Sequence, residues 1–192
     1  YVGYQAGKGA SGADANNIGI GHQSLLAVVN ASNNIAIGKA AMTTMTAGGN
    51  NVAVGGQALD AIAVGESGNV AIGIDAMSSV DEGTAGGDAD LNVAIGYQAL
   101  LGGDFAGNDR QLQGNIAIGA NALDATGSNA QSGTIAIGQN ALGALTSGTG
   151  NVAIGSLALE QHTTGSRNIA IGFEASALTG GGTASACNDN LF

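Results

Sequence analysis

Acidic side chains are the residues in this sequence whose clustering suggests chemistry. Six of the fourteen fall in the second halves of two long repeat units: Asp81, Glu82, Asp88, Asp90, Asp104 and Asp109. The segment Asp88-Ala-Asp90-Leu-Asn92 begins like a calcium-binding loop, but Val93 stands where such a loop needs glycine and Ala99 where it closes with glutamate. Asp88 and Asp90 are therefore the candidate calcium ligands, and plain solvated loops are the alternative.

Other reactive residue types occur singly. The segment Gly7-Lys8-Gly9-Ala10-Ser11-Gly12 matches Gly-x-Gly-x-x-Gly, yet no βαβ pattern follows it and a glycine-rich array produces this spacing by chance. His22 and His162 have no second ligand at metal-binding spacing, so both are predicted to be solvated surface residues. Cys187 has neither a partner cysteine nor a positioned base. We therefore predict that the chain is not an enzyme and needs no cofactor.

Composition narrows the class of protein further. The chain has 35 glycines among 192 residues, no proline and no tryptophan, with 44% hydrophobic and 9% charged residues. These values exclude charge-rich disorder and collagen. The net charge of −10 argues against nucleic acid or an anionic membrane surface as partner, since both attract basic residues. Apolar runs are also too short to cross a bilayer, so no membrane insertion is expected in this segment.

A repeat organises the whole chain. The motif Asn-[Ile/Val]-Ala-[Ile/Val]-Gly-x-x-[Ala/Ser]-[Leu/Met] recurs at steps of 17, 17, 18, 23, 23, 19, 17 and 17 residues. Its nine copies start at Asn17, Asn34, Asn51, Asn69, Asn92, Asn115, Thr134, Asn151 and Asn168. We predict one array over residues 1–192 built from 17-residue units, with insertions within 78–91 and 101–114. Both ends of the chain are fractions of the motif, which predicts a segment of a longer fibrous protein.

Each copy of the motif predicts a short strand. Side chains two residues apart share a face, so the β-branched pair points one way while alanine and glycine point the other. We predict that the pairs form the core: Ile35, Ile37, Val52, Val54, Val70, Ile72, Val93, Ile95, Ile116, Ile118, Ile135, Ile137, Val152, Ile154, Ile169 and Ile171. A strand-like second half at residues 60–65 predicts another strand on the far side of the coil. The fold class is therefore an all-β, parallel β-solenoid of about eleven short coils.

Residues at the two ends of each strand are predicted to form corners. Glycine accepts a positive φ, and asparagine tolerates the left-handed conformation better than most residues. The predicted corner residues are Asn34, Asn51, Asn69, Asn92, Asn115, Asn151 and Asn168, with Gly38, Gly55, Gly73, Gly96, Gly119, Gly138, Gly155 and Gly172. Helical repeats are disfavoured, because each glycine in a helix costs up to about 1 kcal/mol.

The alanine of the motif is predicted to face outward and to contact other chains. Each coil offers only about three large apolar side chains for its core, so contacts between chains are expected to supplement it. Stacking in register would align the alanines into a smooth stripe, which we interpret as the chain-to-chain interface. The stripe contains Ala36, Ala53, Ala71, Ala94, Ala117, Ala136, Ala153 and Ala170.

The repeat resembles those in the heads of trimeric autotransporter adhesins. It is most similar to a 17-residue version with Ala-Ile-Gly-x-x-Ala-Leu and Thr-Thr-Gly before the asparagine, found in phage tail fibres and related bacterial surface proteins. In this chain Ala153-Ile154-Gly155-Ser156-Leu157-Ala158-Leu159 and Thr163-Thr164-Gly165 carry those features. The resemblance implies a left-handed β-roll, three chains around one axis, and extracellular attachment. The chain departs from this pattern in three ways: Thr134 stands in place of asparagine, Gly19 stands in place of alanine, and two repeats carry insertions.

These observations lead to an expected function and one principal alternative. We expect a structural and adhesive segment of a trimeric fibre, located outside the cell on a bacterial surface or a virion. Its partners would be two further copies of the chain and a receptor or glycan on a host or neighbouring cell. The alternative is a homopolymer that stacks end to end as a filament. An ice-binding solenoid is disfavoured, because threonine occurs in only some coils.

Overall fold

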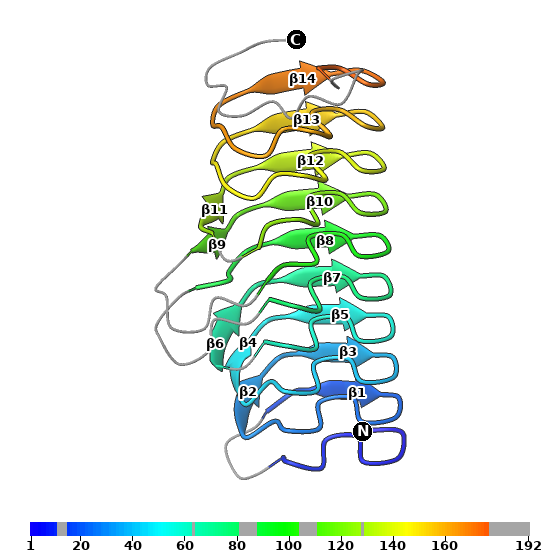
Figure 1. Ribbon diagram of the computed structural model, residues 1–192. Helices are drawn as coiled ribbons and strands as arrows, with labels where there is room; N and C mark the ends of the chain where they lie inside the picture. Colours follow the sequence, from blue (N-terminus) through cyan, green and yellow to red (C-terminus); the bar gives the residue numbers. More distant parts are fainter. Residues whose placement is uncertain (11–14, 63, 81–87, 104–110, 128, 177–192) are drawn as a thin grey trace.

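The chain forms a parallel β-solenoid with a long sheet along one side (Figure 1). The computed structural model describes residues 1–10, 15–62, 64–80, 88–103, 111–127 and 129–176, which contain no helix. Nine three-residue strands stack in the long sheet, so eight turns separate the first from the last. They are β1 (Ile18–Ile20), β3 (Ile35–Ile37), β5 (Val52–Val54), β7 (Val70–Ile72), β8 (Val93–Ile95), β10 (Ile116–Ile118), β12 (Ile135–Ile137), β13 (Val152–Ile154) and β14 (Ile169–Ile171).

The predicted second strand is present in some turns. β2 (Asn30–Ser32), β4 (Ala47–Gly49) and β6 (Val64–Ser67) form a second sheet, and β9 (Leu112–Gln113) pairs with β11 (Gln131–Ser132). These strands lie at the left edge of the stack, where the returning chain leads into the next strand of the long sheet (Figure 1). β6 begins at Val64, later than the expected segment 60–65, because the returning chain first fills the interior with Ile62.

The all-β solenoid prediction is confirmed, but the predicted number of coils is not. Beyond the nine strands, Val2 continues the stack through a parallel bridge to Ile20. The final motif fraction, residues 190–192, lies outside the described residues. The long repeats leave the register intact, since Val70 pairs with Val93 and Val93 with Ile116 despite steps of 23 residues. Extra residues are therefore accommodated away from the long sheet.

The glycine corners are confirmed. In all eight predicted corner glycines φ lies between 132° and 142°, a region that side chains with a Cβ rarely adopt. The glycines also stack on one another: a Cβ added to Gly38 would overlap the carbonyl oxygen of Gly55 in the next turn. Both the backbone angle and the close approach of successive turns therefore require glycine here.

The motif asparagines do not form left-handed corners, and this prediction was wrong. Asn34, Asn51, Asn69, Asn92, Asn115, Asn151 and Asn168 are all buried and none has a positive φ. The left-handed residue is the one before each of them, for example Asn33, Gly114 or Arg167. A corner needs one such residue, and its side chain points to solvent. The following asparagine is thereby directed inward.

Inside the coil the asparagines of successive turns form a hydrogen-bonded ladder. Asn92 is representative: its Nδ2 donates to Asn69 Oδ1 at 3.1 Å and to the Leu112 carbonyl at 2.6 Å. Its Oδ1 accepts from both the backbone N–H and the Nδ2 of Asn115, each at 3.0 Å. The same pattern links Asn17, Asn34, Asn51 and Asn69. Every polar atom of the buried carboxamide is thus satisfied, as burial requires.

Thr134 interrupts this ladder. Its backbone N–H donates to Asn115 Oδ1 at 3.0 Å, but its buried Oγ1 has no hydrogen-bond partner among the described residues. The threonine side chain also lacks the second donor that each asparagine gives to a carbonyl of the next turn. The ladder resumes between Asn151 and Asn168. The turn that contains Thr134 is therefore joined to its neighbours by fewer side-chain hydrogen bonds than the other turns.

The orientation of each strand is the reverse of the one predicted. The central alanine of the motif points into the coil and has no exposed surface, whereas the β-branched pair points outward. None of the sixteen residues predicted as core is buried: Ile35, Ile37, Val52, Val54, Val70, Ile72, Val93, Ile95, Ile116, Ile118, Ile135, Ile137, Val152, Ile154, Ile169 and Ile171. Alternation correctly grouped the residues by face but does not say which face is inside.

The core is instead filled from the corner that closes the first half of each unit. Leucine or methionine at the ninth motif position is at most 1% exposed, as in Met42, Leu59, Met77 and Leu100. These residues adopt φ values near +50°, which turns the side chain inward. Such a conformation is uncommon for leucine, and hydrogen bonds to the next turn, such as Leu59 N–H to the Ala76 carbonyl at 3.0 Å, hold it. With the interior occupied this way, only alanine fits beneath the strand.

Candidate interaction surface

The outer face of the long sheet is a charge-free apolar surface, and we call it the Val/Ile face. Residues at the first and third positions of the nine strands stack in two columns of nine side chains each, all valine or isoleucine. The pairings place Ile18 on Ile35 in one column and Ile20 on Ile37 in the other. Because every pairing is parallel and in register, the columns run straight along the solenoid.

This face is uncovered in the single chain. Ile18 is 47% exposed, Ile37 37% and Ile171 61%, and the remaining members are partly exposed. Parallel sheets are almost always covered on both faces, since their strands carry apolar side chains on each side. A contiguous apolar surface of this kind marks an interaction site in soluble proteins. The geometry therefore identifies the Val/Ile face as the candidate site.

Large exposed side chains extend the surface around its edges. Tyr4, Ile74, Tyr97 and Phe173 each follow a corner glycine beside the second column and are 51–70% exposed. The ring of Tyr4 also stacks on that of His22, with centroids 5.5 Å apart. At the opposite edge, Leu91 is 68% exposed. Tyrosine side chains are frequent anchors of protein–protein contacts.

The predicted alanine stripe is not an interface. Each member is completely buried within its own chain: Ala36, Ala53, Ala71, Ala94, Ala117, Ala136, Ala153 and Ala170. The reversed strand orientation is the physical reason, because it exchanges the inner and outer faces of the sheet. The surface able to contact another chain consists of larger, more apolar side chains than predicted.

The candidate calcium ligands are not brought together as a metal site. Asp88 Oδ2 accepts from Gln113 Nε2 at 3.3 Å, and Asp90 Oδ1 accepts from the Ser67 N–H at 2.6 Å. Within the described residues no three His, Cys, Asp or Glu side chains lie close enough to hold a metal ion. Asp81, Glu82, Asp104, Asp109 and Cys187 lie outside the described residues. Asp88 and Asp90 instead connect successive turns.

His162 was predicted to be a surface residue, and this prediction was wrong. Its side chain is 2% exposed and lies six residues before a ladder asparagine, a position that Met45 and Leu145 occupy in other turns. Burial lowers the pKa of His162, because desolvation disfavours the charged imidazolium. Nothing in the spacing of a lone histidine indicated this. The position in the repeat was the signal that could have found it.

Comparison of the chain with protein-family models, with curated proteins and with solved structures found no match. In the part of the chain that the structure describes, no helix is long and apolar enough to span a membrane. The assignment of function therefore depends on the surface itself.

Proposed function

We propose that this chain is a segment of an extracellular trimeric fibre, in which the Val/Ile faces of three copies pack around a common axis. The observation that carries the proposal is the uncovered pair of Val/Ile columns on a parallel sheet. A second copy is the fitting occupant because its own columns have the same straight course and spacing. Self-association is also compatible with the net charge of −10, since no charged side chain lies in the columns.

The number three and the role in attachment come from the resemblance to adhesin and tail-fibre repeats. A closed threefold arrangement would bury the same face of every copy, as symmetric oligomers require. The stacked turns would then form a stiff rod that carries receptor- or glycan-binding surfaces away from a bacterial cell or virion. Residues 78–91 and 101–114 contain the insertions that would vary that outer surface.

The proposal is tested by the mass of the segment in solution, measured by size-exclusion chromatography with light scattering. We expect three times the chain mass of 18.3 kDa. The variant Ile95→Lys places a charge in the middle of the face and should give a folded monomer. The matched control Ser79→Lys adds the same charge at an exposed position outside the columns and should leave the trimer intact.

Each alternative assembly gives a different result in the same experiment. A wild-type mass of 18.3 kDa would contradict the trimer. Open-ended polymers that persist in Ile95→Lys would favour the end-to-end filament instead, because stacking of turns does not use the Val/Ile face. Attachment is tested next, by retention of the labelled trimer on glycan arrays and on bacterial cells; absence of any retention would remove the adhesive role.

A further inference from the structure

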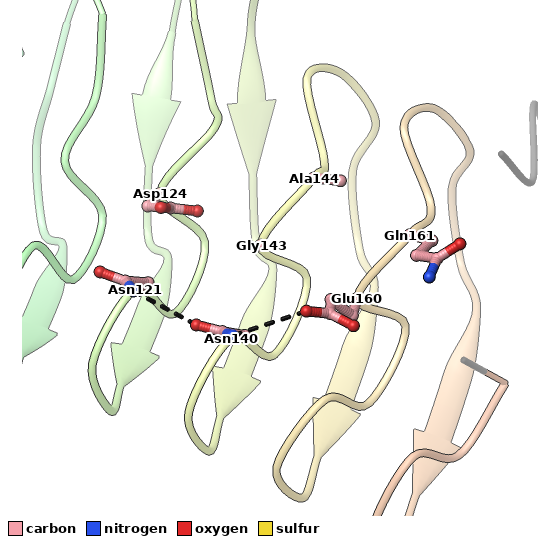
Figure 2. A pocket seen from close by; sticks show the side chains of 7 residues that line it. All are labelled: Asn121, Asp124, Asn140, Gly143, Ala144, Glu160 and Gln161. Atoms are coloured by element: carbon pink, nitrogen blue, oxygen red, sulfur yellow. Dashed lines mark hydrogen bonds between the residues drawn. The ribbon is translucent and has the colours of Figure 1, made fainter. Parts of the chain in front are cut away.

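A polar hollow lies on the flank of the solenoid away from the Val/Ile face (Figure 2). It has a volume of about 370 Å³ and is built by three successive turns. The turn after β10 contributes Asn121 and Asp124, the turn after β12 contributes Asn140 and Gly143, and the turn after β13 contributes Glu160. Its volume is within the range of small-ligand pockets, but its lining is far more polar than most.

The hollow exists because one turn has glycine at a position where the turns on either side have an acidic side chain. Asp124, Gly143 and Glu160 occupy the same position in three consecutive turns, one residue after the buried leucine. Gly143 does not have a positive φ, so the backbone does not require glycine there. A Cβ at Gly143 would lie 3.3 Å from the Asn140 carbonyl oxygen and 3.5 Å from Asp124 Oδ1, so a side chain fits there after a shift of a few tenths of an ångström. The carboxylates of the two flanking turns therefore border a gap that a side chain at Gly143 would fill.

The floor of the hollow is held in place by a chain of hydrogen bonds. Asn121 Nδ2 donates to Asn140 Oδ1 at 3.3 Å, and Asn140 Nδ2 donates to Glu160 Oε1 at 3.5 Å, as the dashed lines in Figure 2 show. The backbone is fixed as well, with the Gly143 N–H bonded to the Asn140 carbonyl at 3.1 Å. A ligand would thus meet side chains that are already ordered, which lowers the entropy cost of binding.

The electrostatics of the hollow favour a cation. Two carboxylates border it and none of the residues that line it is basic, while the whole chain carries a net charge of −10. Partial burial raises the pKa of Asp124, although hydrogen bonds from its own N–H and that of Ala125 oppose the rise. A desolvated carboxylate gains most from a positively charged hydrogen-bond donor.

We propose that this hollow is a binding site for a small amine, whose ammonium group is held by one of the two carboxylates, Asp124 or Glu160, while its other polar groups meet the carboxamides. Two sources share this chemistry, an amino sugar with a free amine and an aliphatic polyamine. The site goes beyond the proposed assembly function and does not depend on it, because its residues lie outside the Val/Ile face.

The site is tested by titrating the protein with glucosamine and with spermidine, using isothermal titration calorimetry and ligand-observed NMR. N-Acetylglucosamine is the neutral control for the sugar. We expect at least one amine to bind and the neutral sugar to bind about tenfold more weakly or not at all, because it lacks the charge-assisted hydrogen bonds. Binding of glucosamine alone would identify an amino-sugar site, and binding of spermidine alone a polyamine site.

Two kinds of variant localise the binding. Gly143→Gln fills the hollow, and Asp124→Asn with Glu160→Gln removes its charge; each should weaken amine binding about tenfold or more. Gly56→Gln is the matched control, because Gly56 also has no positive φ and has room for a Cβ. Thermal unfolding of every variant confirms that it is folded. Failure of both amines to bind, or binding that Gly143→Gln leaves unchanged, would overturn the proposal.

Discussion

The two faces of the long sheet differ in what they demand from a side chain. On the inner face, alanine lies beneath a row of leucine and methionine side chains with no exposed surface, beside a ladder of hydrogen-bonded asparagines. On the outer face, either valine or isoleucine occurs at equivalent positions of different turns, and these side chains remain partly exposed. The inner face therefore determines whether one chain folds, and the outer face determines what the folded chain contacts. Substitutions on the two faces should separate these properties.

The largest effect is expected from the ladder. Asn92→Leu removes the acceptor for two donors of Asn115 and the donor to the Leu112 carbonyl, and leaves these groups buried without partners. We expect the free energy of unfolding to fall by about 4 kcal/mol, measured by chemical denaturation. Asn92→Thr places at this position the residue that Thr134 has in its own turn, and it should lower the free energy of unfolding by about half as much. This variant replaces Asn92→Leu in the experiment if the leucine variant does not fold.

Asn50→Gly is the control for this experiment. Asn50 has the left-handed conformation, is exposed, and corresponds to Gly114 and Gly133 in other turns. Its replacement should change the free energy of unfolding by less than about 0.5 kcal/mol. Equal losses for Asn92→Thr and Asn50→Gly would show that the ladder adds nothing beyond corner geometry.

The next largest effect is expected from overfilling the inner face. Ala136→Ile adds three carbon atoms to a fully buried site, so we expect a loss of about 3 kcal/mol in the free energy of unfolding. Ile137→Thr changes the adjacent outward side chain and should cost less than about 1 kcal/mol. Both are measured in the Ile95→Lys background, so that assembly does not contribute. If the Ile137 variant were the less stable of the two, the assignment of the faces would be wrong.

The smallest effect is a gain. Thr134→Asn restores a carboxamide that can donate to Asn115 Oδ1 and accept from Asn151, and it removes the unpartnered Oγ1. We expect the free energy of unfolding to rise by about 1 kcal/mol, detected as a higher denaturation midpoint. A lower midpoint would mean that this turn has adapted to threonine and that the ladder is not uniform along the chain.

Much of the fold could be predicted from the sequence, because period and glycine placement are local properties. The recurrence of Gly38 and its equivalents located the corners, and the motif located the strands. The orientation could not be predicted in the same way. Alternation shows that Val93 and Ile95 share a face, but the width of the coil decides which face is inside, and that width depends on Leu100 reaching across it.

The asparagine ladder did leave a signal in the sequence. The residue before each ladder position varies among asparagine, glycine, leucine and arginine, whereas the ladder position itself is asparagine in eight of nine copies. A purely conformational role would accept glycine as readily as asparagine. The recurrence of asparagine rather than glycine at this position indicates a need for its carboxamide. The apolar interaction surface was missed for the same reason as the core, since both follow from the reversed orientation.

The in-register ladder also bears on how such a molecule can change in length. Each asparagine bonds only to the turns directly before and after it, and each strand of the long sheet pairs only with its neighbours. If one whole 17-residue unit were removed or duplicated, the turns brought together would again pair strand with strand and asparagine with asparagine. Unequal recombination within the gene could therefore shorten or lengthen the rod by one strand spacing at a time, without requiring any compensating substitution.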